Sequence, residues 1–186
     1  MKKRCSWAGS DPLYIDYHDR EWGVQVHDDR KLFEFLLLEG AQAGLSWITI
    51  LKKRDSYRKA FDSFDPEKIS FYGPAEIGLL LENQGIVKNR MKIESAIMNA
   101  KSFLAVKKEY GSFDSYVWKF TYGKQIRNSW TETSRIPSLT EESVAMSLDM
   151  KQRGFKFVGP TICYSFMQAV GMVNDHTVDC FRYNQV

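Results

Sequence analysis

Apolar residues recur three and four positions apart along much of this chain, which is the spacing of one face of an α-helix. One predicted helix begins after Asp28 or Asp29, either of which suits an N-cap. Its apolar stripe consists of Leu32, Phe33, Leu36 and Leu37. A second helix is expected to begin at Ser46, with one face formed by Trp47, Ile50, Leu51, Tyr57 and Phe61.

Start and stop signals predict the remaining helices. Asp65-Pro66 is a helix start, Gly73-Pro74 is a breaker, and a short helix is expected to end at Gly85. A longer helix then runs to Gly111, with a stripe of Ile93, Ile97, Ala100 and Leu104. Three more are expected at residues 113–121, 140–152 (with Ser138 and Glu141 as a capping box) and 161–173.

Two stretches lack this periodicity. Residues 5–27 are interrupted by Asp11-Pro12 and Gly23 and are expected to be an aromatic-rich loop packed on the core, with His27 at the surface. Residues 122–137 are expected to be an irregular loop. Because no sustained alternation of apolar and polar residues is present, the pattern predicts an all-α fold of about eight short helices.

Composition adds few constraints. At 186 residues, with 44% hydrophobic and 26% charged residues, the chain is expected to form a single domain, 1–186, with a core that needs no disulfide. The net charge of +3 excludes a general polycation but permits a local basic face. Three cysteines, an odd number, without a signal peptide or a long apolar span indicate a reduced, cytoplasmic protein that is not in a membrane.

The cysteines and histidines suggest a metal site. His176 and Cys180 lie four positions apart, and Cys5 and His18 at the other end of the chain could complete a tetrahedral site. Two thiolates and two imidazoles suit zinc, and four protein ligands make such a site structural. The spacing is not that of a local zinc finger, so a free Cys5 thiol and a capping His176 remain an alternative. Cys163 lies on an apolar helix face and is expected in the core.

A glycine-bounded turn, Gly154–Pro160, precedes the last predicted helix. The free N–H groups at such a helix start can bind a phosphate, and Lys151, Arg153 and Lys156 flank the turn. Backbone contacts to nucleic acid are therefore one interpretation. The other is an ordinary joint between two helices, since these also use glycine.

Glu39 lies near the end of an apolar predicted helix, where the helix dipole disfavours a negative charge. A lone glutamate of this kind is commonly solvated. The small residues that follow and the nearby Trp47 favour the alternative that Glu39 lines a pocket.

Taken together, these residues resemble the DNA-3-methyladenine glycosylase I family over essentially the full length and in the same order. The matching residues are Cys5, the run Asp11 to Ile15, Tyr17-His18-Asp19, Glu21-Trp22-Gly23, Glu39, the run Gln42 to Trp47, Leu51 to Arg54, Arg153 to His176, and Cys180. The resemblance implies a helix-hairpin-helix fold, excision of alkylated adenine from double-stranded DNA with release of free 3-methyladenine, a monomer, and a structural zinc on Cys5, His18, His176 and Cys180.

The resemblance also implies roles for particular residues. The hairpin, with Gly154, Lys156 and Gly159, would hold the phosphate backbone, and the turn at Gly44 and Leu45 would enter the gap left by the flipped base. Glu39 would accept hydrogen bonds from the adenine edge. The base pocket would be lined by Trp7, Tyr14, Tyr17, Trp22 and Trp47, with Tyr17 and Trp47 stacking on the base.

Strand cleavage is not expected. Thr161 occupies the position at which some related hairpins carry a catalytic lysine. Asp175 and Asp179 lie downstream, and we interpret both as structural neighbours of the zinc, although the distance of Asp179 from the hairpin resembles that of a catalytic aspartate. The competing hypotheses are a zinc-containing DNA-binding module without catalysis and a zinc hydrolase, the latter excluded if four protein ligands surround the metal.

Overall fold

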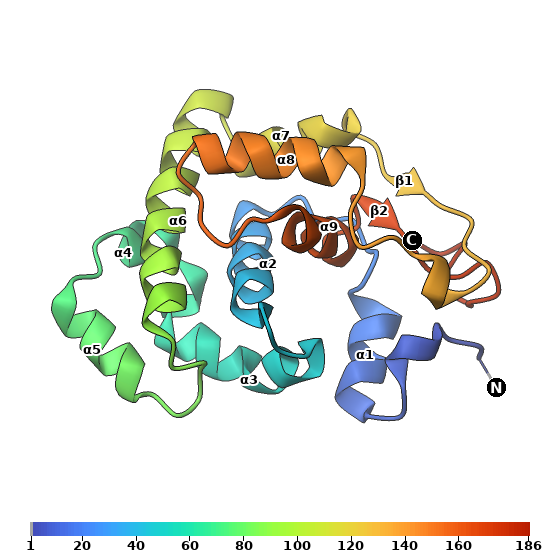
Figure 1. Cartoon of the computed structure of the whole chain (residues 1–186), viewed down its shortest axis with the longest axis horizontal. Coiled ribbons are helices and arrows are strands. Elements are labelled where there is room, and N and C mark those ends of the chain that lie inside the picture. Colours follow the sequence, from blue (N-terminus) through green and yellow to red (C-terminus); the bar gives the residue numbers. More distant parts are fainter. Residues whose placement is uncertain (1) are drawn as a thin grey trace.

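The computed structural model describes residues 2–186, and this part of the chain is mostly helical. Figure 1 shows the arrangement of its nine α-helices. These are α1 Pro12–Arg20, α2 Asp29–Gln42, α3 Trp47–Ala60, α4 Pro66–Ser70, α5 Pro74–Glu82, α6 Arg90–Tyr110, α7 Phe113–Trp118, α8 Glu141–Gln152 and α9 Pro160–Ala169. Short 3₁₀ turns lie at Ser6–Ala8 (η1), Asp62–Phe64 (η2), Lys119–Thr121 (η3) and Thr133–Arg135 (η4).

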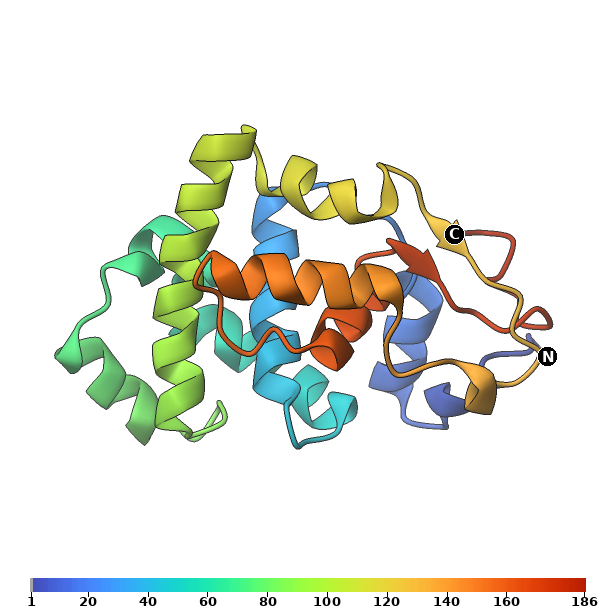
Figure 2. The same ribbon diagram turned by 45° about the horizontal axis from the view of Figure 1, so that its top comes forward.

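Helix α2 lies in the middle of the molecule and packs against α3, α6, α7 and α9. Every residue from 32 to 41 in it is buried, so this helix is enclosed on all sides rather than along one stripe. Helix α8 passes in front of α6 and α2 in the turned view of Figure 2, packs against α9 and η3, and leads through a turn into α9. Helices α4 and α5 lie at one end of the molecule and α1 at the other.

Several predicted helix ends are confirmed. The Asp28 carboxylate accepts a hydrogen bond from the Lys31 N–H at 2.8 Å and caps α2. Asp65 caps α4 in the same way, and Gly111 ends α6 with a φ of 84°. Helix α8 differs from the prediction, because its N-cap is Thr140, paired with Ser143, instead of Ser138 paired with Glu141.

The prediction of a loop at residues 5–27 is wrong for its central part, which forms α1. The Asp11 carboxylate accepts a hydrogen bond from the Leu13 N–H at 3.0 Å, and Pro12 occupies the first helical position. Asp-Pro therefore starts a helix here, as it does at α4. His27 is exposed, as expected, and bonds to Asp114 at 2.8 Å.

The prediction of a mostly helical fold is confirmed, and the structure adds two short strands that pair in parallel. They are β1, Ile126–Arg127, and β2, Val173–Asn174. Helix α9 stops at Ala169 instead of Val173, since Gly171 adopts a φ of 72° and lies directly against the Val24 backbone. The chain after Gly171 is therefore free to pair with β1.

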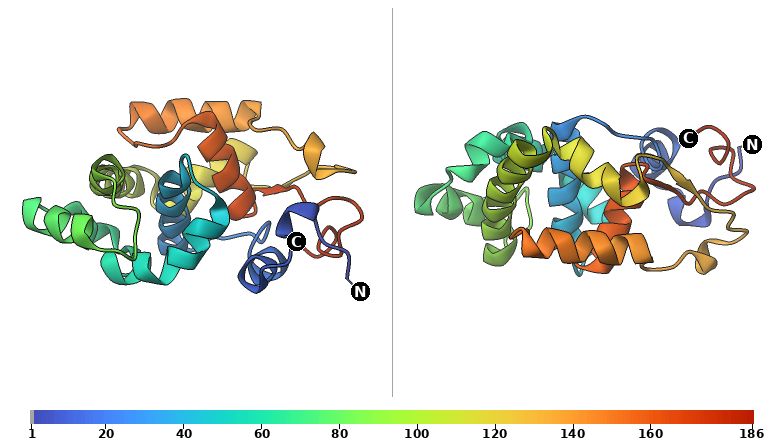
Figure 3. Two further views of the ribbon diagram at one scale, coloured as in Figure 1. Left: turned by 60° about the horizontal axis from the view of Figure 1, so that its bottom comes forward. Right: turned by 90° about the horizontal axis from the view of Figure 1, so that it is seen from above.

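The two termini lie at the same end of the molecule in both views of Figure 3. The Phe181 N–H donates to the Lys3 carbonyl at 2.9 Å, and the Val178 N–H donates to the Trp130 carbonyl at 2.9 Å. The first residues, the 122–137 loop and the C-terminal tail are therefore joined beside α1. Within residues 2–186, no helix combines the length and apolar character needed to cross a membrane.

Candidate functional site

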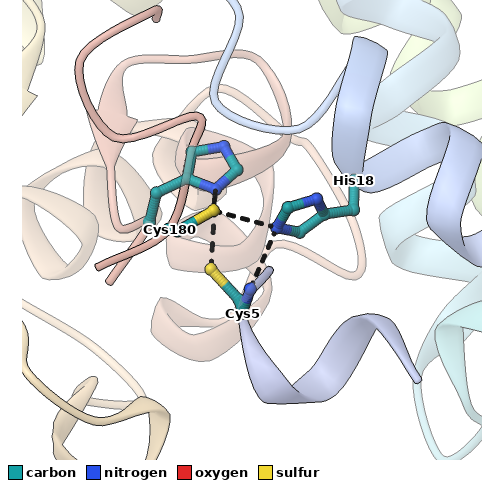
Figure 4. Close-up of side chains that lie close together, drawn as sticks. Cys5, His18 and Cys180 are labelled. Carbon is teal, nitrogen blue, oxygen red and sulfur yellow. Dashed lines mark hydrogen bonds between the residues drawn. The ribbon is translucent and has the colours of Figure 1, made fainter. Parts of the chain in front are cut away.

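The structure brings the four predicted metal ligands together. Cys5, His18, His176 and Cys180 are all buried, and their ligand atoms lie within 4.8 Å of one another. The side chains of Cys5, His18 and Cys180 point toward a common centre (Figure 4). Residues from the N-terminal segment, from α1 and from the C-terminal tail therefore form one cluster.

The spacing of these atoms fits a tetrahedral zinc ion. Bonds of about 2.3 Å to sulfur and about 2.05 Å to nitrogen separate a sulfur and a nitrogen ligand by about 3.6 Å. The Cys180 sulfur lies 3.5 Å from His18 Nε2 and 3.5 Å from His176 Nδ1, and the Cys5 sulfur lies 3.5 Å from His176 Nδ1. The donor set and its size both match zinc.

Hydrogen bonds fix the other nitrogen of each imidazole. His18 Nδ1 lies 2.8 Å from Asp19 Oδ1, and His176 Nε2 lies 3.0 Å from the Trp22 carbonyl. The Arg4 guanidinium donates to Asp19 and lowers the pKa of that carboxyl to about 2. Each imidazole is thus oriented with one nitrogen toward the centre, as metal-ligating histidines are.

The carboxylate that contacts a histidine of this cluster is therefore Asp19, for which the sequence analysis gave no role. Asp179 is 42% exposed at its side chain and forms an ion pair with Lys3 at 2.6 Å. Asp175 is fully buried, but its oxygens accept hydrogen bonds from other side chains and from neither histidine. Asp19 directly follows His18 in the sequence, and this position could have identified Asp19 as the partner of that histidine.

A second site is an open pocket of about 630 Å³ beside the cysteine–histidine cluster. All five aromatic residues selected from the sequence line it together with Glu39. Its other residues, to which the sequence analysis gave no role in a pocket, are Gln42, Thr133, Ile136, Ser165 and Gln168. Helices α1, α2, α3 and α9 and the loop at η4 contribute to the walls.

The aromatic rings of the pocket pack against one another at an angle. Trp7 lies 5.0 Å from Tyr14 and 4.8 Å from Trp22 between ring centroids. Tyr17 and Trp47 lie 5.4 Å apart with 52° between their planes. A flat ligand that stacked on one of these two rings would therefore meet the other at an angle.

Glu39 lies in the last turn of α2 and is only 4% exposed. Burial alone raises the pKa of Glu39 to about 8, and no side chain or backbone group within residues 2–186 donates a hydrogen bond to it. Trp47 Nε1, also buried, has no hydrogen-bond partner. Buried polar groups are normally paired, so an acceptor and a donor left unpaired in one pocket indicate a ligand site.

The turn after α2 exposes the two residues predicted to enter DNA. Gly44 has a φ of 78°, with open space where a Cβ would lie, and Leu45 is 40% exposed. Lys92 from α6 holds the start of this turn, donating to the carbonyls of Ala41 at 2.8 Å and Ala43 at 2.7 Å. The turn is therefore braced from behind while its tip faces solvent.

The turn between α8 and α9 is held in the same way by buried polar side chains. Asn99 donates to the Lys156 carbonyl at 3.0 Å and accepts from its N–H at 2.7 Å, and Ser147 donates to the Val158 carbonyl at 2.6 Å. Gly154 has a φ of 90°, which favours glycine, whereas Gly159 has a φ of −63°, which any residue can adopt.

The charged residues near this turn differ in their availability. Arg153 is bound to Glu109 and Asp149, both at 2.7 Å, so it is not the free cation that its position in the sequence suggested. Lys151 and Lys156 are exposed.

Cys163, as predicted, lies in the core.

Comparisons with known proteins agree with this geometry. The sequence model of the methyladenine glycosylase family matches residues 7–183. The DNA-3-methyladenine glycosylase of Haemophilus influenzae is 48% identical over 180 residues, which cover 97% of each chain. A crystal structure of 3-methyladenine DNA glycosylase I matches with a TM-score of 0.94 and 51% identity, covering 96% of this chain and 98% of its own.

The 3-methyladenine DNA glycosylase I of Staphylococcus aureus is a more distant relative, at 37% identity, yet its structure matches with a TM-score of 0.93 over 96% of this chain and 95% of its own. Both the sequence and the fold are thus shared along the full length. The chain belongs to the methyladenine glycosylase family.

Proposed function

We propose that the protein is a monofunctional DNA glycosylase that flips 3-methyladenine out of alkylated double-stranded DNA and releases it by hydrolysis, without cleaving the strand. The observation that carries this proposal is Glu39, a buried carboxylate without a partner in a pocket of aromatic rings. The structure of the Staphylococcus aureus relative describes 3-methyladenine recognition by that enzyme, which supports the same substrate here.

Alkylation at N3 gives the base in DNA a positive charge, and the pocket suits such a ligand. Electron-rich rings attract a cationic base more strongly than a neutral one. A positive base also lowers the pKa of the adjacent Glu39 again, because an opposite charge favours the ionised carboxylate. Glu39 then accepts a charge-assisted hydrogen bond, so binding of the alkylated base and ionisation of Glu39 reinforce each other.

Release of the base needs little further catalysis, because breaking the glycosidic bond neutralises the positive charge of the leaving group. The pocket contains no lysine that could attack the sugar and form an imine. Thr161 stands where such a lysine is expected, and Asp175 and Asp179 do not line the pocket. Water is therefore the proposed nucleophile, and the proposed products are free 3-methyladenine and an intact strand with an abasic site.

For DNA contacts we propose a helix-hairpin-helix formed by α8 and α9. Main-chain groups from Gly154 to Gly159 and the free N–H groups at the start of α9 would bind phosphates, with exposed Lys156 adding charge. Gly44 and Leu45 would fill the space left by the flipped base, as their exposure on a braced turn allows.

We propose that zinc is bound by Cys5, His18, His176 and Cys180. The ion would act as a structural cross-link between the two ends of the chain, since four protein ligands leave no position for water or substrate. A single domain spanning residues 1–186, a monomeric state and a cytoplasmic location remain predictions.

The test measures free 3-methyladenine released from methylated DNA by the wild type and by Glu39→Gln, with Glu82→Gln as control because Glu82 is exposed at the end of α5. We expect release by the wild type and the control and a loss of about 10²-fold or more in Glu39→Gln. DNA binding without release would favour a binding module. A borohydride-trapped protein–DNA adduct, or cut strands, would contradict the monofunctional mechanism.

A further inference from the structure

The wall of the pocket formed by α9 contains a glutamine whose orientation is fixed from behind. Gln168 lines the pocket, and its Nε2 donates to Asp175 Oδ2 at 2.7 Å. A carboxylate oxygen that already receives hydrogen bonds can only accept, so the side-chain NH₂ of Gln168 must face Asp175. The amide oxygen of Gln168 therefore points away from Asp175 and is available as an acceptor.

Asp175 is well placed to impose this orientation, because it is fully buried and already holds four donors. Its Oδ2 also accepts from the Tyr164 hydroxyl at 2.6 Å. Its Oδ1 accepts from Asn128 Nδ2 and Trp130 Nε1, both at 2.7 Å. Both oxygens only accept, so a rotated Gln168 would place its amide oxygen against a carboxylate oxygen; the contacts therefore hold the amide in a single orientation.

Gln168 also lies far along α9 from the turn proposed to bind DNA. It is nine residues beyond Gly159, which places it about 13 Å along α9 from the turn proposed to hold the phosphates. A purine that enters from the DNA side carries its glycosidic nitrogen toward the backbone. Its 6-substituent is the ring position farthest from that nitrogen and reaches deepest.

We propose, on the basis of the function proposed above, that Gln168 is a specificity-determining residue. Its amide oxygen, positioned by Asp175, accepts a hydrogen bond from the 6-amino group of a flipped alkylated adenine. A guanine presents an oxygen at the same position, and two acceptors facing each other repel. The pair Asp175–Gln168 thereby selects 6-amino purines over 6-oxo purines, and Glu39 alone is not responsible for this choice.

The test uses quenching of the pocket tryptophans to measure the affinity for free 3-methyladenine and for free 3-methylguanine. Gln168→Met keeps the length of the side chain but removes the acceptor. We expect it to weaken 3-methyladenine binding about tenfold and, because the repulsion toward the 6-oxygen is also removed, to strengthen 3-methylguanine binding.

Asp175→Asn tests the positioning role. An asparagine at this position presents NH₂ to Gln168, which then rotates and turns its own NH₂ into the pocket. We expect the preference for 3-methyladenine over 3-methylguanine to fall by more than tenfold, and the double variant to lose no more affinity for 3-methyladenine than the more affected single variant. Tyr164→Phe removes another donor from Asp175 but leaves the Gln168 amide oriented, so it should keep the wild-type preference.

An unchanged preference in Gln168→Met would overturn the inference even if Asp175→Asn does not fold. Multiplicative losses in the double variant would also overturn it, since they would mean that Asp175 supports the fold and not the orientation of Gln168. Failure of the wild type to bind or release 3-methyladenine would instead contradict the proposed function.

Discussion

Replacing Glu39 by glutamine should make the protein more stable at high pH while reducing its activity. Burial raises the pKa of Glu39 from 4.5 to about 8. Between these values the folded chain keeps a proton that the unfolded chain has lost. The stability that comes from this difference is fully present below pH 4.5 and is lost as the pH rises through 8. Glutamine keeps the size of the side chain and cannot ionise.

The magnitude follows from the two pKa values. At 1.36 kcal/mol per unit, the wild type should lose about 3 kcal/mol of unfolding free energy at pH 7 and about 5 kcal/mol at pH 9, relative to low pH. The difference in unfolding free energy between Glu39→Gln and the wild type (the stability gap) should therefore widen by about 4 kcal/mol between pH 5 and pH 9. Taking this difference between two pH values cancels any constant effect of the substitution.

Urea unfolding of both proteins at pH 5, 7 and 9 measures the gap, and Glu82→Gln supplies the baseline for an exposed glutamate. Base release is measured in the same samples. A gap that stays constant within about 1 kcal/mol would show that Glu39 is not a buried, unpaired carboxyl and would refute the reasoning.

Three further predictions concern the supports of the site. Cys180→Ser should lower bound zinc from one ion per chain by elemental analysis and reduce the unfolding free energy by several kcal/mol, because four-ligand zinc sites contribute directly to folding. Lys92→Met should lower kcat/KM on methylated DNA about five- to tenfold, because Lys92 holds the exposed turn that is proposed to enter DNA. The affinity for free 3-methyladenine should not change. Equal losses in both assays would contradict this prediction. Lys156→Ala should reduce the slope of log affinity for DNA against log salt by about one, measured by fluorescence anisotropy, and an unchanged slope would remove Lys156 from the DNA contacts.

The chemistry of the side chains made much of the site predictable from the sequence. Few combinations of cysteine and histidine exist in this chain, so Cys5, His18, His176 and Cys180 could be selected without a fold, and their clustering is confirmed. Glu39 was noticeable because its charge opposes the helix dipole. The family expected from the motifs is also confirmed.

Other parts depend on contacts that are distant in the sequence. Ser165 and Gln168 are ordinary polar residues on a helix, and only packing places them in the pocket. Thr133 and Ile136 reach the pocket because their loop is tied to the C-terminal tail by the pairing of β1 with β2. The early end of α9 has the same origin, since Gly171 lies against a segment more than 140 residues earlier in the chain.

The metal cluster and the pocket share structural elements, so zinc would influence base recognition without touching the base. A hydrogen bond between His176 Nε2 and the Trp22 carbonyl orients the imidazole, and the side chain of Trp22 lines the pocket. Trp7, another lining residue, packs its ring 5.2 Å from the His18 ring and follows Cys5 by two positions. Helix α1 carries His18 on the buried side together with Tyr17, which lies beside Trp47. Loss of the ion would release α1 and the first residues together, and these form the aromatic wall opposite α9. The position of the rings proposed to receive a flipped base would therefore depend on a metal site that has no chemical role in removing that base.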